Sequence, residues 1–301
     1  MEETSRRITS KSEKILQVIA HVVLIFLSLC SIVPFLLLVV SSFTPEQELL
    51  SSGYTFLPKA FSLEAYEYLL ESNGNNIFRS YFITICMTAI GTGLSLLITP
   101  MLAYVLSRKD YCRRGVLTFF VFFTMLFNGG LVPTYMVYTR IFMIKNTWLA
   151  YIIPALLVNA FNVLLMKSYF TLNIHPAMIE AAKIDGASEG KIYRRIILPL
   201  SLPIMATIGL MVGINYWNDW MNPLYYITKQ EMWSLQSFLN RILNSIQVLS
   251  QMAGRADTSI NMPGTAARMA IAVIGVIPIM VLYPFFQKYF VKGISLGGVK
   301  E

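Results

Sequence analysis

IHPAMIEAAKIDGASEGKIYRRIILP, from Ile174 to Pro199, is the one stretch where charge, glycine and small residues crowd between two long apolar segments. Four apolar segments precede it and two follow it. Hydrophobic residues make up 55% of the 301 residues and charged residues only 13%, well below the roughly 25% of soluble domains. The composition is that of a membrane protein.

Six intervals almost free of charge surround this stretch, and each approaches or exceeds the ~20 residues that cross a membrane as a helix. Strands are excluded, because a barrel would show segments of ~10 residues with alternating hydrophobicity. We therefore predict an all-α membrane protein with six transmembrane helices in a domain of residues 15–291, between an N-terminal segment 1–14 and a tail 292–301. The predicted spans are about 15–43, 80–107, 115–139, 146–168, 197–222 and 268–288.

The distribution of Lys and Arg gives the orientation. With a cytoplasmic N-terminus, sixteen of the 24 basic residues fall on the inner side and eight on the outer side, as the positive-inside rule requires. Both termini and residues 174–199 are then cytoplasmic. The basic residues lie at the ends of spans, and no solvated basic face with interleaved aromatics is evident, so nucleic acid is not an expected partner.

Two glycine pairs predict local geometry within the spans. Gly129-Gly130, after Asn128, is expected to break the third span. Gly209 and Gly213 fit the small-xxx-small pattern of closely approaching helices.

Sites for catalysis, metals or cofactors are not predicted in this chain. The sequence around Gly190-Lys191 does not match a phosphate-binding loop. The three cysteines and two histidines have no metal-ligand spacing. Since almost no ionisable side chain lies inside the spans, the chain has no means of coupling an ion gradient to transport.

The opening stretch is predicted to form two short helices around a turn. Pro176 suits a first helical turn, Asp185-Gly186 ends the first helix with a left-handed glycine, and Ser188 can cap the second. Four apolar side chains are expected to serve as anchors for a partner's groove: Met178, Ile179, Ile184 and Tyr193. On physical grounds alone, a plain cytosolic connector is an equally good interpretation.

EAAKIDGA at residues 180–187, followed by IILP at 196–199, resembles the EAA motif of ABC importer permeases. Two further segments, NGGLVPTY at 128–135 and YWNDW at 216–220, are similar to the carbohydrate branch, which includes the MalG-like permeases and the oligosaccharide and polysaccharide permeases. The resemblance covers all six spans.

This resemblance implies a type I ABC importer permease fold in the cell membrane of a prokaryote. Its expected partners are a second, homologous permease subunit, two ATPase subunits that bind ATP and Mg, an extracytoplasmic solute-binding protein and an oligosaccharide. The residues that it assigns to ATPase coupling are Glu180, Ala181, Ala182, Asp185 and Gly186. The outer segment of about 44–78 is interpreted as an amphipathic helix on the membrane surface or as a docking face for an extracytoplasmic protein. The resemblance implies that the last outer loop, about 229–267, is a second candidate contact for the binding protein.

Aromatic and amide side chains gather at the outer half of the fifth span, as a sugar pathway would require. The candidate substrate path comprises Asn215, Tyr216, Trp217, Asn218, Asp219 and Trp220. An interfacial aromatic belt is the alternative.

Other functions remain as alternatives. An ABC importer permease for a non-sugar solute is the nearest alternative, and only the resemblance to the carbohydrate branch argues against it. A secondary transporter would need coupling-ion residues or an internal repeat, and a membrane enzyme would need a catalytic cluster; neither feature is evident in the sequence.

Overall fold

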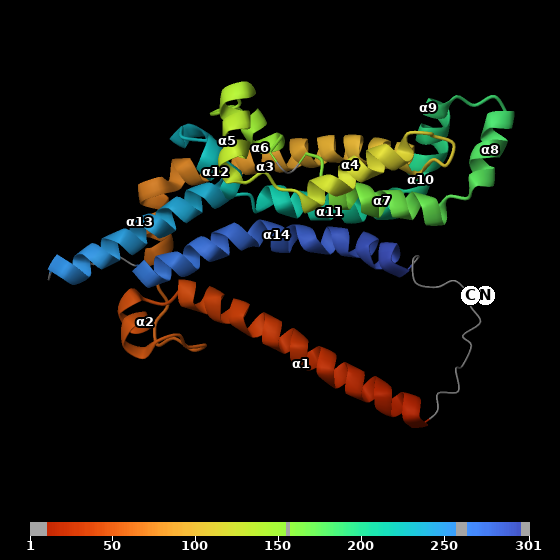
Figure 1. Ribbon diagram of the computed structural model, residues 1–301. Helices are drawn as coiled ribbons and strands as arrows, with labels where there is room; N and C mark the ends of the chain where they lie inside the picture. The colour runs from red at the N-terminus through yellow and green to blue at the C-terminus, as the bar shows by residue number, and fades with distance from the viewer. Residues whose placement is uncertain (1–10, 155–156, 257–263, 296–301) are drawn as a thin grey trace. The chain divides into compact units, whose positions relative to one another are not determined.

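The computed structural model describes residues 11–154, 157–256 and 264–295. Within these residues every regular element is helical (Figure 1), which confirms the all-α prediction. The chain divides into two compact units, Met1–Ser72 with Ile246–Ile274 and Asn73–Ser245 with Gly275–Glu301, and each is described by itself. Most of the predicted terminal segments 1–14 and 292–301 lies outside the described residues.

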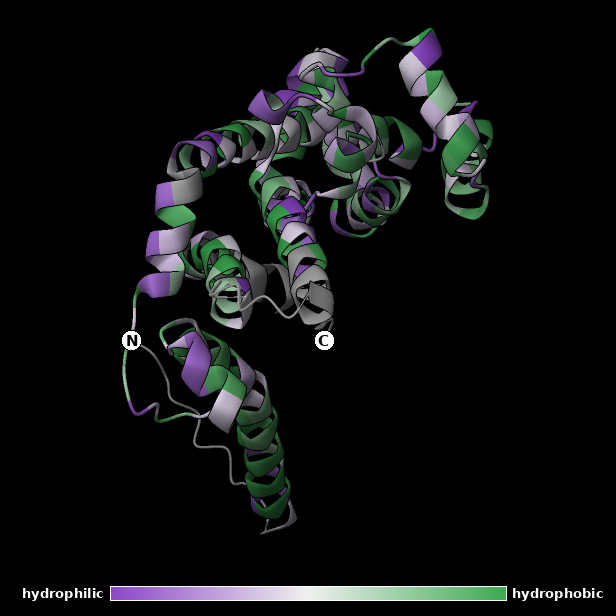
Figure 2. Cartoon of the chain, turned by 90° about the vertical axis from the view of Figure 1, so that its left-hand side faces the viewer, coloured by the Kyte–Doolittle hydropathy of each residue, from purple (hydrophilic) through white to green (hydrophobic). Residues whose placement is uncertain are grey.

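The first unit contains α1 (Lys11–Ser42), α2 (Glu46–Ser52) and adjoining parts of α3 (Glu64–Ser107), α13 (Leu235–Ala256) and α14 (Gly264–Ser295). Helix α1 is apolar along most of its length (Figure 2), and its most apolar window is 0% buried by the rest of the chain. A helix of this length and composition is stable when apolar surroundings cover it, as in a lipid bilayer.

Glu46 fixes the start of α14 within the first unit. Its carboxylate accepts the Thr265 N–H at 2.8 and 2.9 Å and the Ala266 N–H at 2.8 Å. The first amides of a helix have no intrahelical acceptor, and a negative charge is favourable at that end. The carboxylate therefore holds α2 against the N-terminus of α14.

The second unit contains most of the remaining helices. Helix α4 packs on α7, and α7 packs on α11. Their bounds, in chain order, are α4 Arg114–Leu126, α5 Leu131–Met136, the π-helix η1 Val137–Ile141, α6 Leu149–Ile152, α7 Ala160–Asn173, α8 Pro176–Ile184, α9 Glu189–Ile192, the π-helix η2 Tyr193–Ile197, α10 Leu198–Leu200, α11 Leu202–Trp217, α12 Met221–Tyr226 and the 3-10 helix η3 Gln230–Met232.

Three described helices are long and apolar enough to cross a membrane: Ser12–Ser42 of α1, Gly74–Ser107 of α3 and Gly264–Val281 of α14. Two bent pairs, Arg114–Leu126 with Leu131–Ile141 and Glu189–Leu200 with Leu202–Trp217, raise the number to five if each pair is one span. The sixth span, about 146–168, stays a prediction. Helix α3 begins at Glu64, so the predicted span 80–107 is the C-terminal part of a longer helix.

The predicted break at Gly129-Gly130 is confirmed. The segments before and after it meet at 114°. Gly130 has a φ of 86°, and the Asn128 side chain accepts the Gly130 N–H at 2.9 Å, an interaction that competes with helical hydrogen bonding. A second bend of 77°, between α10 and α11, was not predicted.

Helices α3 and α11 approach each other closely at glycines, as Gly209 and Gly213 predicted. A Cβ atom on Gly209 would lie 3.1 Å from Leu96 Cδ1 of α3. An even closer approach occurs at Gly91, where an added Cβ would lie 2.3 Å from Tyr216 Cζ. The core of the second unit is built around this pair of helices and α7.

Candidate functional site

The stretch 174–199 forms α8, a turn, α9 and the π-helix η2 at one end of the second unit (Figure 1). His175 Nδ1 accepts the Ala177 N–H at 3.3 Å, and Pro176 opens the helix. Gly186 has a φ of 75° and donates its N–H to the Lys183 carbonyl at 3.0 Å, so the predicted left-handed glycine is confirmed. Ser188 precedes α9, but its side chain makes no capping hydrogen bond. The expected cap is wrong in that respect.

The two faces of α8 have different surroundings. Met178 and Ile184 are exposed, by 43% and 87%. Ile179 packs on the core of the second unit, as does Tyr193 of η2. The prediction of four apolar anchors is therefore wrong for Ile179 and Tyr193. Helical geometry turns Ile179 by about 100° from Met178 and towards the core, and Tyr193 of η2 packs on the same core. An exposed, partly apolar face of α8 remains.

The five residues of the expected coupling set lie mostly on this accessible side of the loop. Four of them are exposed, namely Glu180, Ala181, Asp185 and Gly186. Ala182 is half-buried and packs on the core together with Ile179.

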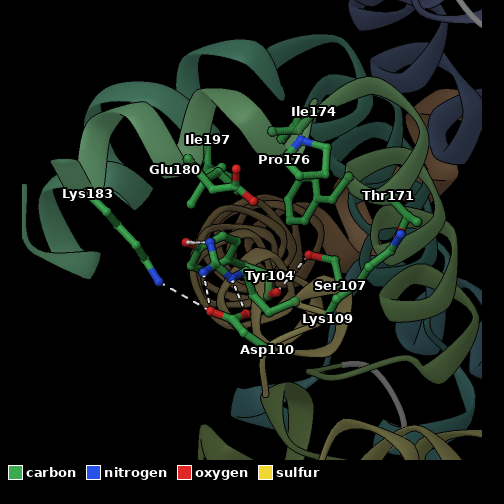
Figure 3. A pocket seen from close by; sticks show the side chains of 13 residues that line it. Tyr104, Ser107, Lys109, Asp110, Thr171, Ile174, Pro176, Glu180, Lys183 and Ile197 are labelled. Carbon is green, nitrogen blue, oxygen red and sulfur yellow. Dashed lines mark hydrogen bonds and ion pairs between the residues drawn. The ribbon is translucent and has the colours of Figure 1, made fainter. Parts of the chain in front are cut away.

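Four charged side chains form an ionic network between the end of α3 and the loop: Arg108, Asp110, Lys183 and Glu189. The Arg108 Nε donates to Asp110 Oδ1 at 2.8 Å. The Lys183 Nζ lies 3.2 Å from Asp110 Oδ2 and 2.9 Å from Glu189 Oε1. Arg108 Nη2 lies 3.6 Å from the same Glu189 oxygen, which closes the ring of contacts. Figure 3 shows Lys183 reaching across to Asp110.

Tyr104 of α3 extends this network into the protein. Its hydroxyl donates to Glu189 Oε2 at 2.8 Å and lies 3.3 Å from Arg108 Nη1. Its ring lies 5.6 Å from the ring of Tyr193, centroid to centroid. The side chain of Arg108 is only 13% exposed, whereas those of Asp110, Lys183 and Glu189 are 57%, 41% and 55% exposed. Burial therefore shields the network from solvent only at Arg108.

The charges in the network stabilise one another. The Arg108 guanidinium holds the pKa of the Asp110 carboxyl well below its usual range, and the Lys183 ammonium lowers the pKa of Glu189. The bond to Glu189 in turn raises the pKa of Lys183. All four groups are therefore charged at neutral pH.

A cavity of about 220 Å³ lies between the end of α3 and α8. Glu180 lines it opposite Lys109 and Asp110 (Figure 3). Glu180 is exposed, and among the ion pairs of the described residues none includes it. Because it is exposed, its carboxylate is accessible to a charged group of another molecule.

The structure divides the second predicted set, residues 215–220, between the core and the surface. Tyr216 is 4% exposed and donates its hydroxyl to the Ile152 carbonyl at 2.9 Å. Trp217 is 5% exposed and donates its Nε1–H to the Gly275 carbonyl at 3.3 Å. Both rings therefore pack between helices and hold the end of α11.

The other four residues of this set lie nearer the surface. Asp219 is half-buried and accepts the Asn222 N–H at 3.1 Å. The exposed members are Asn215, Asn218 and Trp220. Among the described residues there is no group of three or more His, Cys, Asp or Glu that could hold a metal ion.

The apolar helices of membrane-crossing length are those of a multi-pass membrane protein, and α8 and α9 lie between α7 and α11. Comparison with known proteins identifies its family. The chain belongs to the binding-protein-dependent transport system inner membrane components, whose family model matches residues 73–296.

Several relatives share nearly the whole length of the chain. The polygalacturonan/rhamnogalacturonan transport system permease protein YtcP of Bacillus subtilis (strain 168) is 36% identical over 277 residues, 92% of this chain and 95% of that protein. The arabinooligosaccharides transport system permease protein AraQ of Halalkalibacterium halodurans is 27% identical over 299 residues, 96% of this chain and 99% of that protein.

A solved structure also matches the chain. It is a chain in the crystal structure of a bacterial ABC transporter involved in the import of the acidic polysaccharide alginate, with a TM-score of 0.77 and 31% sequence identity over 94% of this chain and 99% of that one. The fold is that of a type I ABC importer permease, and the chain is a transport subunit rather than an enzyme.

Proposed function

We propose that this chain, with a second homologous permease subunit, forms the membrane pathway of an ATP-driven importer for oligosaccharides or polysaccharide fragments. An extracytoplasmic solute-binding protein delivers the saccharide, and the pathway opens alternately to the two sides of a prokaryotic cell membrane. The transport of saccharides by the related permeases supports this substrate class. Six spans and two cytoplasmic termini, as the positive-inside pattern predicts, would leave residues 174–199 facing the ATPases.

The exposed face of α8 is the observation that carries the proposal. One side of α8 packs on the core through Ile179 and Ala182, while Met178 and Ile184 are left uncovered. A short helix fixed on one side and apolar on the other is suited to a groove in a partner. We assign that groove to one of the two ATPase subunits of the complex, which bind ATP and Mg. Glu180 would supply a charged contact, and the left-handed Gly186 would keep the turn compact.

The division within residues 215–220 refines the proposed substrate path. Tyr216 and Trp217 are committed to hydrogen bonds between helices and act as supports. Trp220 is 41% exposed and, together with Asn215 and Asn218, can offer a ring face and amide groups to a sugar. We therefore assign contact with the saccharide to the three exposed residues.

YtcP is named for the transport of polygalacturonan and rhamnogalacturonan, and the transporter of the solved structure is involved in the import of the acidic polysaccharide alginate. Polygalacturonan, like alginate, is a polymer of uronic acids. Acidic oligosaccharides are therefore the first substrates to test. The complex of both permeases and both ATPases would be reconstituted in liposomes, and uptake of labelled oligogalacturonates, oligoalginates and neutral oligosaccharides would be measured with the partner solute-binding protein. We expect uptake that requires ATP and the binding protein. ATP-dependent uptake of peptides or ions, with none of any saccharide, would overturn the proposal.

A further inference from the structure

We propose that the ionic network is a physical link that transmits displacement of α8 directly to α3. The inference rests on the proposed function, because it concerns how movement of α8 by the ATPases reaches the membrane helices. Without such a link, the chain connects α8 only to α7 on one side and, through the Asp185–Ser188 turn, to α9 and α11 on the other. Helices α4 to α7 lie between α3 and α8 in the sequence, so the polypeptide chain does not connect α3 directly to α8.

The network joins three separate parts of the second unit. Arg108 directly follows α3, Asp110 lies in the loop after it, and Lys183 and Glu189 belong to α8 and α9. Lys183 contacts a carboxylate on each side, at 3.2 Å to Asp110 and 2.9 Å to Glu189. Lys183 is therefore the residue through which the position of α8 is tied to the end of α3.

The contacts of Lys183 are exposed, and an isolated exposed ion pair contributes little, but here the charges act as a connected group. Each of the four charged groups has at least two partners. The guanidinium of Arg108 donates hydrogen bonds to Asp110 through two of its nitrogens, Nε and Nη2. Paired N–H donors on a planar group fix direction as well as distance. The hydroxyl of Tyr104, which donates to Glu189 at 2.8 Å, attaches the network to a residue that is 92% buried in α3.

The ionic network adds direction to the apolar contacts of α8. Ile179 and Ala182 pack on a core shared with α3, but the hydrophobic effect itself is non-directional. The cavity of about 220 Å³ between α8 and the end of α3 also leaves α8 without close packing on that side. Across this gap the charged side chains make the connection.

The test compares the linked and unlinked states within one purified protein. In a variant whose native cysteines Cys30, Cys86 and Cys112 are replaced by serine, Asp110 and Lys183 are both changed to cysteine. The complete complex with its ATPases and binding protein is reconstituted in liposomes, and saccharide uptake per ATP hydrolysed is measured. The measurement is made before treatment, after joining the cysteines with a short bis-thiosulfonate cross-linker, and after reduction.

We expect a loss of at least about fivefold in uptake per ATP before cross-linking, at the lower end of typical coupling effects. The cross-linker should restore most of it, and reduction should abolish the gain. Lys183→Met should show the same loss. Lys191→Met removes an exposed lysine of the same loop that lies outside the network and should stay within about twofold of the unmutated protein.

Two results would overturn the inference while leaving the proposed function intact: an unchanged ratio in Lys183→Met, or a reduced ratio that cross-linking fails to restore. Failure of the unmutated complex to couple ATP hydrolysis to saccharide uptake would instead refute the proposed function. Cross-linking is compared within one preparation, so a gain produced by the cross-linker cannot come from a difference in folding or yield between samples.

Discussion

Replacing Gly91 by alanine should destabilise the packing of α3 against α11. The new Cβ atom would lie 2.3, 2.5 and 2.6 Å from three ring carbons of Tyr216, distances that no stable packing allows. The ring is confined, because Tyr216 is 4% exposed and its hydroxyl is bonded to the Ile152 carbonyl at 2.9 Å. Either the ring or α11 must move.

The magnitude follows from three terms. Overpacking of a core costs ~1–3 kcal/mol, and loss of the Tyr216 hydrogen bond adds ~1 kcal/mol. The higher helix propensity of alanine returns ~1 kcal/mol. The net destabilisation is therefore about 1–3 kcal/mol.

Gly93 provides the matched control on the same helix. No atom lies within 4 Å of a Cβ added there, so Gly93→Ala should leave stability unchanged or raise it. Thermal unfolding of the purified complex in nanodiscs, without substrate, would compare the variants. The midpoint should fall by ~2–4 °C per kcal/mol for Gly91→Ala. The double variant Gly91→Ala/Tyr216→Ala should lose less than the sum of the single changes, because removal of the ring removes the clash. Equal midpoints for Gly91→Ala and Gly93→Ala would refute the reasoning.

Three further predictions concern other parts of the chain. Glu46→Gln should lower stability by ~1 kcal/mol through loss of the charged cap on α14; exposed Glu67→Gln is the control in thermal unfolding, and equal midpoints would contradict the role. Trp220→Ala should reduce saccharide uptake about 2- to 10-fold, from ~0.5–1.5 kcal/mol per aromatic contact, without changing the unfolding midpoint; undiminished uptake would remove Trp220 from the path. The pKa values of Asp110 and Glu189 are lowered in the folded protein, so both carboxylates stay charged above their ordinary pKa values and are protonated only at lower pH. Uptake per ATP should therefore keep the contribution of the network between about pH 5.5 and 8. A drop seen in that range in the unmutated complex but absent in Lys183→Met would contradict this.

Local sequence signals predicted the features that depend on one segment. Apolar intervals without charge identify helices of membrane-crossing length, because charge is costly inside a bilayer. The break at Gly129-Gly130 and the left-handed Gly186 follow from backbone freedom that only glycine supplies at low cost. The pair of small residues Gly209 and Gly213 predicted a close helix contact, although the sequence did not show that α3 is the partner helix.

The features that the sequence did not reveal depend on contacts between distant segments. Lys183 and Asp110 are 73 residues apart, and in the sequence each is one of many charges near a span. The bonds between Glu46 and the start of α14 join positions 219 and 220 residues apart. Hydrophobic periodicity also did not reveal that Ile179 packs on the core while Met178 is exposed. Adjacent residues on a short helix point in different directions, and tertiary packing decides which direction is buried.

The central claim is that α8 receives the movement of partner ATPases, and Glu180→Lys tests it most directly. Lys191→Glu, an opposite charge reversal at an exposed position of the same loop, is the control. Both variants would be reconstituted with the complete complex, and saccharide uptake and ATP hydrolysis would be measured together after membrane insertion is verified. Glu180→Lys is predicted to abolish uptake and to uncouple ATP hydrolysis from the binding protein, while the inserted amount stays normal and Lys191→Glu retains uptake. Uptake by Glu180→Lys at the level of the unmutated protein would contradict the account.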